Sequence, residues 1–173
     1  MPANIEIKAV ADDLDRIRTV AVGIATEPGQ MLHQVDVFFR VHGGRLKLRS
    51  FSAGSGELIY YERPDRPGAR QSRYQIYATS QPQELRSLLA AALDETVIVK
   101  KKREVFLVGQ TRIHLDEVDE LGTFVEVEVV LKPGQSAAEG QQIVVDLMHK
   151  LGIEESDLVS CAYADLLAAT TPD

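Results

Sequence analysis

Charged side chains recur at every second position in several segments of this sequence. Because side chains alternate between the two faces of a β-strand, each such set would share one face. Lysine and arginine bind phosphate oxygens, and carboxylates bind hard divalent cations such as Mg²⁺. Faces of this kind that converge would hold a polyanion together with metal ions. The sets are Glu6 and Lys8; Arg45, Lys47 and Arg49; Lys101 and Arg103; Arg112, His114 and Asp116; and Glu126 and Glu128.

These charged sets lie in segments where apolar and polar residues alternate, which predicts strands. Apolar residues at helical spacing predict helices between some of the strands. Short turns such as Gly43-Gly44 join most neighbouring strands, so we expect an antiparallel sheet, and eight such strands can close into a barrel. Strands are predicted at 4–10, 31–41, 45–51, 57–63, 71–79, 97–108, 111–118 and 123–132, and helices at 14–24, 82–94, 135–151 and 163–169.

The charged strand faces have two interpretations. In the first, they form the solvent-exposed face of an ordinary antiparallel sheet. In the second, the strands form a barrel whose charged faces point inward while helices cover an apolar outside. The amphipathic helices favour the barrel because their apolar sides need a surface to cover, but the residue pattern alone leaves both interpretations open.

Length and composition limit the class of protein. The chain has 173 residues and no linker divides it, so we expect one α+β domain over residues 1–173. A net charge of −7 and a pI of about 5.1 argue against a nucleic-acid-binding surface and against adhesion to anionic membranes. No apolar run reaches the roughly 18 residues of a membrane span, and the first residues show no secretory signal pattern. With Cys161 as the single cysteine, these features favour a cytoplasmic protein.

Several segments, in order along the chain, match the pattern of a known family. The first reads Asn4-Ile5-Glu6-Ile7-Lys8, and the others are 34–39, 45–49, 99–103, 114–118, 121–122, 124–128 and 163–167. Together they resemble the CYTH domain family of triphosphate tunnel metalloenzymes, which opens with Glu-x-Glu-x-Lys, and the resemblance covers nearly the whole chain. The family includes class IV adenylyl cyclases, thiamine triphosphatases and inorganic triphosphatases, and the pattern resembles bacterial class IV cyclase-like members most.

The resemblance implies an eight-stranded antiparallel closed β-barrel, with helices packed on the outside, that binds a triphosphate in its interior. Carried over by position, Lys8, Arg49 and Glu126 would be the catalytic residues. The implied cofactor is Mg²⁺ or Mn²⁺ bound by carboxylates. The implied metal ligands are Glu6, Asp116, Glu126 and Glu128, and the implied phosphate ligands are Lys8, Lys47, Arg49, Arg73, Lys101, Arg103 and Arg112.

The resemblance also implies a metal-dependent phosphoryl-transfer enzyme. In a cyclase, the ribose 3′-hydroxyl of ATP would attack the α-phosphate, so that cyclic AMP forms and pyrophosphate leaves. In a hydrolase, a metal-activated water would attack ATP, thiamine triphosphate or inorganic triphosphate. The expected partner is thus a small-molecule triphosphate, with no nucleic acid and no membrane, and a homodimer is compatible with such a barrel.

Two departures from the family pattern bear on activity. Asn4 replaces the first glutamate of the opening motif, which removes one carboxylate from the metal set. Glu62 stands about where the family has a lysine, and the neighbouring Arg63 is a candidate to supply the missing charge. These departures motivate an alternative function, a non-catalytic module that binds nucleotides or polyphosphate. A plain antiparallel domain with a charged surface is the third hypothesis.

Overall fold

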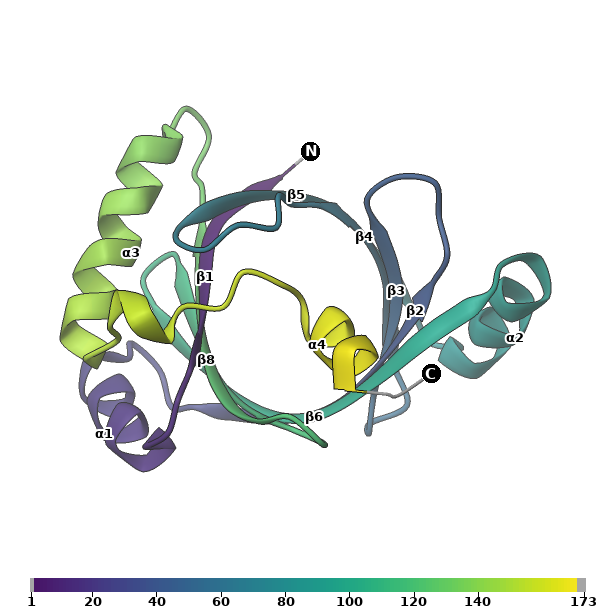
Figure 1. The fold of residues 1–173 in the computed structure, drawn as a ribbon, viewed down its shortest axis with the longest axis horizontal. Coiled ribbons are helices and arrows are strands. Elements are labelled where there is room, and N and C mark those ends of the chain that lie inside the picture. Colours follow the sequence, from purple (N-terminus) through teal and green to yellow (C-terminus); the bar gives the residue numbers. More distant parts are fainter. Residues whose placement is uncertain (1, 171–173) are drawn as a thin grey trace.

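The computed structural model describes residues 2–170 of the chain. Within this range, eight antiparallel strands form a closed barrel in the order β1-β5-β4-β3-β2-β6-β7-β8 (Figure 1). The predicted α+β fold with an eight-stranded barrel is therefore confirmed. The strands are β1 (Ala3–Val10), β2 (Gln30–Phe39), β3 (Arg45–Phe51), β4 (Gly56–Glu62), β5 (Arg70–Thr79), β6 (Glu95–Val108), β7 (Thr111–Val118) and β8 (Gly122–Val130).

The first strand closes the barrel because it pairs on both of its sides. β1 is antiparallel to β5, with Glu6 opposite Arg70, and antiparallel to β8, with Lys8 opposite Glu126. Both neighbours are distant in sequence, so closure brings together segments from the two halves of the chain. Charged residues of β1 therefore come to lie beside charged residues of β8.

Helices cover the outside of the barrel, which decides between the two interpretations of the charged faces. α1 (Leu14–Ile24) and α3 (Ala137–Leu151) lie on one side of the barrel, and α2 (Pro82–Ala92) lies on the other (Figure 1). Ile5 and Ile7 of β1 are buried in one hydrophobic cluster with Val144 of α3. Glu6 and Lys8 alternate with these isoleucines and line the interior. The charged faces point inward.

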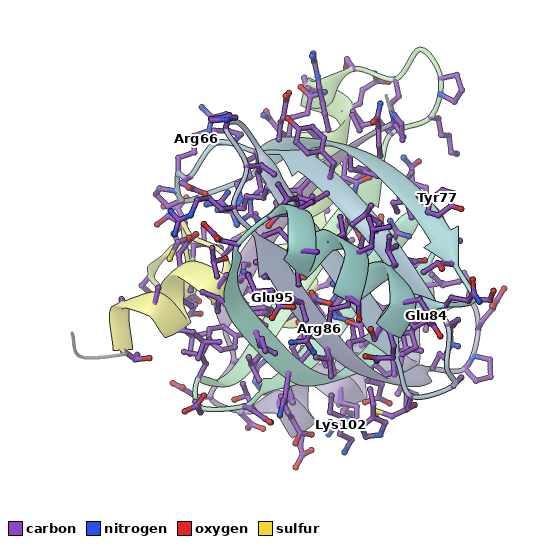
Figure 2. The ribbon with its side chains drawn as sticks, turned by 90° about the vertical axis from the view of Figure 1, so that its right-hand side faces the viewer. Arg66, Tyr77, Glu84, Arg86, Glu95 and Lys102 are labelled. Carbon is purple, nitrogen blue, oxygen red and sulfur yellow. The ribbon has the colours of Figure 1, made fainter. Side chains whose placement is uncertain are left out.

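α2 packs over β2 and β3. Leu85 and Leu89 of this helix pack against the buried apolar cluster that contains Leu48. Arg86 donates to both carboxylate oxygens of Glu95, the first residue of β6, at 2.8 and 2.9 Å. Figure 2 shows these two side chains next to each other beside the helix. An apolar face and an ion pair together fix α2 on the barrel.

α4 (Tyr163–Thr170) lies across one end of the barrel rather than against its side (Figure 1). Tyr163 and Leu167 are buried in a cluster with Val99, Val118 and Phe124, which belong to β6, β7 and β8. A short 3₁₀ helix (Glu155–Asp157) precedes α4 along the chain. At this end, therefore, α4 covers a cluster of apolar barrel residues.

The helix ends differ from the sequence prediction where capping residues intervene. α3 begins at Ala137 rather than at 135 because Ser136 and Glu139 form a capping box, in which each side chain bonds the other residue's backbone N–H. It ends at the predicted Leu151, and Gly152, with a φ of 66°, caps it. α2 ends at Ala92 rather than at 94 because Leu93 is already extended and leads into β6.

Two further expectations concern the chain as a whole. Within residues 2–170, no helix combines the length and the apolar character that crossing a membrane requires. The predicted domain runs over residues 1–173, and its first and last residues lie outside the described range.

Candidate functional site

The barrel encloses a cavity of about 410 Å³ that is lined by charged residues from most of the strands. Among the predicted phosphate ligands, all except Arg73 line it, and so do the predicted metal ligands Glu6, Glu126 and Glu128. The structure thus brings together residues that are far apart in the sequence. The lining cations are Lys8, Lys47, Arg49, Arg63, Lys101, Arg103 and Arg112, and the lining carboxylates are Glu6, Asp36, Glu57, Glu126 and Glu128.

Asp36 of β2 binds three of these cations. It is buried and accepts hydrogen bonds from Nε and Nη2 of Arg49, each at 2.8 Å. The Nζ atoms of Lys47 and Lys101 lie 3.0 and 3.2 Å from its Oδ2. Burial opposes the charged form, but the three cations hold the pKa of Asp36 well below its usual value. The sequence prediction gave Asp36 no role because one acidic residue among cations carries no spacing signal.

The lysines of the cavity are buried and crowded by other cations. Burial lowers the pKa of Lys47 and, more strongly, that of Lys101, and the neighbouring arginines lower both further. Asp36 opposes this shift in both lysines. A polyanion in the cavity would oppose it too, because it would add negative charge beside the ammonium groups.

Lys8 of β1 sits between β8 and the segment that leads into α4. Its Nζ lies 3.6 Å from Oε1 of Glu126, 3.2 Å from the carbonyl oxygen of Cys161 and 3.7 Å from the centre of the Tyr163 ring. Burial lowers the pKa of Lys8 to about 8, although Glu126 favours the charged form. Lys8 is therefore a cation whose charge is sensitive to pH in the range where enzymes work.

Arg103 of β6 connects two of the predicted metal ligands. It donates to both oxygens of Asp116, at 2.7 and 2.6 Å, and to Oε2 of Glu126 at 2.8 Å. The Tyr163 hydroxyl donates to Asp116 at 2.7 Å. Asp116 is fully buried and does not line the cavity. It lies behind Arg103, away from the cavity surface. Its role in this structure is to orient Arg103.

Glu128 of β8 lies beside Asn4, the residue that departs from the family pattern. The Asn4 side-chain amide donates to Glu128, and Arg112 Nε donates to it at 2.9 Å. Among the described residues, the Asn4 Oδ1 atom is buried and accepts no hydrogen bond. An oxygen without a donor, next to two carboxylates on one strand face, suits a hard cation.

The protein oxygens in the cavity could hold Mg²⁺ or Mn²⁺ only together with phosphate oxygens of a bound ligand. Within residues 2–170, no group of three or more His, Cys, Asp or Glu side chains is placed to hold a metal ion. Mg²⁺ usually takes one or two carboxylates together with phosphate oxygens rather than an all-protein cage. Glu126, Glu128 and Asn4 Oδ1 match that partial donor set. Glu6, the remaining predicted metal ligand, is instead bound by Arg63 at 2.6 Å.

Two arginines inside the barrel add to the predicted ligand set, and of these only Arg63 was a candidate from the sequence. Arg63, which directly follows β4, lines the cavity, while Arg70 of β5 is fully buried next to it and donates to the Ser160 carbonyl at 2.6 Å. In the described part of the chain, Nε and Nη2 of both arginines are buried and make no hydrogen bond. Such donors are costly to leave unsatisfied, so they mark a place for an anion.

Arg73, a predicted phosphate ligand, is not among the residues that line the cavity. Ser72 and Tyr74 line the cavity, so Arg73, which lies between them on β5, points outward and is exposed. Glu62 lies opposite Arg73 in the sheet, is also exposed, and accepts a hydrogen bond from the Tyr60 hydroxyl at 3.0 Å. The unfavourable charge expected from Glu62 is therefore outside the cavity, and Arg63 supplies a cation inside it.

Comparison with known proteins gives a family and a set of similar folds. Residues 2–163 match the CYTH domain family. A protein from Pyrococcus horikoshii has 22% identity and a TM-score of 0.84, with 94% of this chain and 98% of that chain covered. A candidate adenylate cyclase from Vibrio parahaemolyticus has 21% identity and a TM-score of 0.78, with 95% and 97% covered.

A third similar fold comes from a plant. It is a candidate adenylyl cyclase from Hippeastrum, reported with a dominant triphosphatase activity, and it has 12% identity and a TM-score of 0.72, with 99% and 97% of the two chains covered. At these identities the structural likeness shows a shared fold. Among curated proteins, no sequence matches this chain.

Proposed function

This chain belongs to the CYTH domain family, and from that membership we propose that it is a metal-dependent phosphoryl-transfer enzyme acting on a triphosphate. The observation that carries the proposal is the convergence of lysines and arginines from several strands on one cavity inside the barrel. A triphosphate concentrates negative charge in a short chain, and guanidinium and ammonium groups neutralise it. Despite a net charge of −7, seven of the 19 lysines and arginines line this one cavity.

Lys8 and Arg49 are the groups that would act on the transferred phosphoryl group. Both side chains line the cavity and are almost buried, at 3% and 12% exposure, so water screens their charge little. During the transfer, charge shifts among the phosphate oxygens, and cations already in place stabilise it without reorganising. Asp36 positions Arg49 before the substrate enters, and phosphate oxygens would then share that guanidinium group.

Glu126 and Glu128, with Oδ1 of Asn4, would hold the divalent cation. When bound, Mg²⁺ or Mn²⁺ would neutralise charge on the phosphate oxygens. Glu126 has a second task, because it binds Arg103 at 2.8 Å and lies 3.6 Å from the Lys8 ammonium group. It therefore holds two cations beside the position proposed for the phosphate chain.

A turnover screen of the purified chain tests the proposal. ATP, thiamine triphosphate and inorganic triphosphate are each supplied with Mg²⁺ and with Mn²⁺. Phosphate release identifies a hydrolase, whereas pyrophosphate with cyclic AMP identifies a cyclase. Lys8→Ala and Glu126→Ala should each abolish turnover without unfolding the chain, while Arg73→Ala, on the outer face, should leave it unchanged. Wild-type rates in both cavity variants would contradict the site assignment.

A non-catalytic module that binds nucleotides or polyphosphate is the second candidate. It is favoured by Asn4, which replaces a carboxylate, and by the pairing of Glu6, Glu126 and Glu128 with arginines. Such a module would bind ATP through the same cations and turn over none of the three triphosphates. The turnover screen, combined with a binding measurement on the same preparation, separates the two functions.

A further inference from the structure

The chain between the 3₁₀ helix and α4, residues 158–162, crosses one end of the barrel (Figure 1), and we call it the strap. Leu158 forms an isolated antiparallel bridge with Ala9 of β1. The next N–H, that of Val159, donates to the Lys8 carbonyl oxygen at 2.8 Å. These backbone contacts lay the strap along the strand that carries Lys8 into the cavity.

Arg70 of β5 holds the middle of the strap. Its side chain is fully buried, and its Nη1 atom donates to the Ser160 carbonyl at 2.6 Å and to the Val159 carbonyl at 3.3 Å. The same nitrogen donates to the Arg66 carbonyl at 2.9 Å, in the loop between β4 and β5. One guanidinium nitrogen therefore joins the strap and this loop to the wall of the barrel.

The charge of Arg70 is kept in the interior without a close carboxylate of its own. Its Nε atom lies 4.0 Å from Oε1 of Glu6, and Arg63 already binds that oxygen at 2.6 Å. Burial and the neighbouring Arg63 lower the pKa of Arg70. Burying a charge in this way is costly unless hydrogen bonds compensate for it. The bonds to the backbone of the strap are therefore the contacts that account for an arginine at this position.

The other end of the strap reaches the ammonium group of Lys8. The Cys161 carbonyl oxygen lies 3.2 Å from Lys8 Nζ, and the centre of the Tyr163 ring lies 3.7 Å from it. Oε1 of Glu126 is 3.6 Å away, whereas an ammonium group that closes on a carboxylate reaches about 2.7–2.9 Å. Two uncharged partners thus hold the ammonium group short of Glu126, where a phosphate oxygen can still approach it.

We propose that Arg70 is a positioning residue for the triphosphate site. By fixing the strap, it places the Cys161 carbonyl and the Tyr163 ring so that they direct the Lys8 ammonium group into the cavity. The inference rests on the proposed function in one respect, which is that Lys8 binds a triphosphate. It goes further because Arg70 does not line the cavity and acts through the backbone. With the strap released, Lys8 would close on Glu126, and phosphate would have to compete with that carboxylate.

A double-mutant cycle tests whether Arg70 acts through Lys8. Calorimetry of the full chain with inorganic triphosphate in EDTA measures affinity without turnover. Lys8→Met should weaken binding about tenfold and Arg70→Met about fivefold, because each loses a charged contact or its orientation. The double variant should bind within about twofold of Lys8→Met alone, since coupled residues are not additive. An Arg70 that attracted the anion directly would instead weaken binding in both backgrounds.

Arg16→Met is the matched control for this cycle. Arg16 of α1 also donates to two backbone carbonyls, those of Leu151 and Gly152, at 3.1 and 3.5 Å, but it does so outside the barrel. Its loss removes the same kind of contact from a helix end instead of the strap. The affinity for triphosphate should not change.

Hydrogen exchange measures the strap without any ligand. Because the Val159 N–H is bonded to the Lys8 carbonyl, Arg70→Met should speed exchange of this amide about tenfold. Arg70→Lys keeps a charged donor, so it should restore part of the protection and part of the affinity. Asp165→Ala loosens the strap from the surface, since Asp165 accepts from the Ala162 N–H at 3.0 Å, and it serves if Arg70→Met does not fold. It too should weaken binding only when Lys8 is present.

The combined results separate this inference from the proposed function. Additive losses of affinity in the double variant, or faster exchange at Val159 with unchanged affinity, would overturn the positioning role of Arg70. Unchanged exchange in Arg70→Met would show that it does not hold the strap, and would overturn that role as well. Wild-type protein that binds triphosphate without turning it over would remove the proposed enzyme function and leave the positioning of Lys8 standing. Wild-type protein that binds no triphosphate would overturn both.

Discussion

Asp36 and Arg49 are joined by two parallel hydrogen bonds, Nε to Oδ1 and Nη2 to Oδ2, each 2.8 Å long. They lie directly opposite each other on β2 and β3. Because the pair is buried and bidentate, it fixes the orientation of the guanidinium group before any ligand is present. Lys47 and Lys101 bind the same carboxylate, so one anion organises three cations.

Asp36→Asn should therefore destabilise the protein, and bound triphosphate should restore part of the lost stability. Three buried cations would lose their counter-ion, and we expect the free energy of unfolding to fall by about 3 kcal/mol. A bound polyanion would replace the missing negative charge. Inorganic triphosphate should therefore reduce the difference in the free energy of unfolding between Asp36→Asn and wild type. Urea denaturation with and without triphosphate measures both effects. The control is Asp94→Asn, in an exposed pair with Arg40, and a loss there as large as in Asp36→Asn would contradict the assignment.

Triphosphate binding should weaken as the pH rises through about 8, because Lys8 loses its proton there. Burial lowers the pKa of this ammonium group to about 8, from the 10.5 that it keeps in the unfolded chain. Between these values the unfolded state binds more protons, so the contribution of Lys8 makes the free energy of unfolding rise with pH. Affinity and stability thus change in opposite directions.

Titration calorimetry on both sides of this pH checks the effect on affinity. Lys8→Arg keeps a positive charge over the whole range, so its affinity should fall less steeply with pH than that of wild type. If the affinity of Lys8→Arg falls with pH as steeply as that of wild type, the group that titrates is not Lys8.

Arg63→Ala should weaken triphosphate binding about tenfold or more, because a charged hydrogen bond to phosphate is lost. Arg73→Ala should leave binding unchanged, since this side chain is exposed on the outside of the barrel. The two substitutions remove the same group, Arg63 from inside the barrel and Arg73 from its outer face. Calorimetry with ATP measures both, and equal effects would contradict the strand registers described above.

Metal removal should stop turnover and leave the fold intact. Excess EDTA should abolish activity, and added Mn²⁺ or Mg²⁺ should restore it. The melting temperature should not change, because Glu126 and Glu128 already have Arg103 and Arg112 as partners when no metal is bound. A fall in melting temperature on chelation would show that the metal is structural, and activity that survives chelation would remove the metal from the mechanism.

Periodicity predicted the fold because apolar and charged residues alternate along the strands. Ile5 and Ile7 alternate with Glu6 and Lys8, and the outward apolar residues find helices to cover them. What periodicity did not decide was the direction of the charged face. That depends on barrel closure, which brings β1 between β5 and β8 and which no local pattern records.

The site was predicted less completely than the fold, for reasons that concern particular residues. Arg70 and Arg73 lie three positions apart on one strand and so face opposite sides, and the sequence prediction chose the outward one. Asp36 was missed because its function comes from its neighbours on β3 and β6. Asp116 matches the family pattern, yet Arg103 and Tyr163 occupy its oxygens, which only tertiary structure reveals.

The position of β1 affects how the protein folds and how it loses activity. It is the strand that completes the ring, and it also carries Asn4, Glu6 and Lys8 into the cavity. Its pairing with β8 joins residues that are far apart in the sequence, a type of contact that forms slowly. If β1 detaches, two strand edges become free to pair with other chains at the same moment as the cavity loses one wall. Loss of activity and the onset of aggregation should then be a single cooperative event.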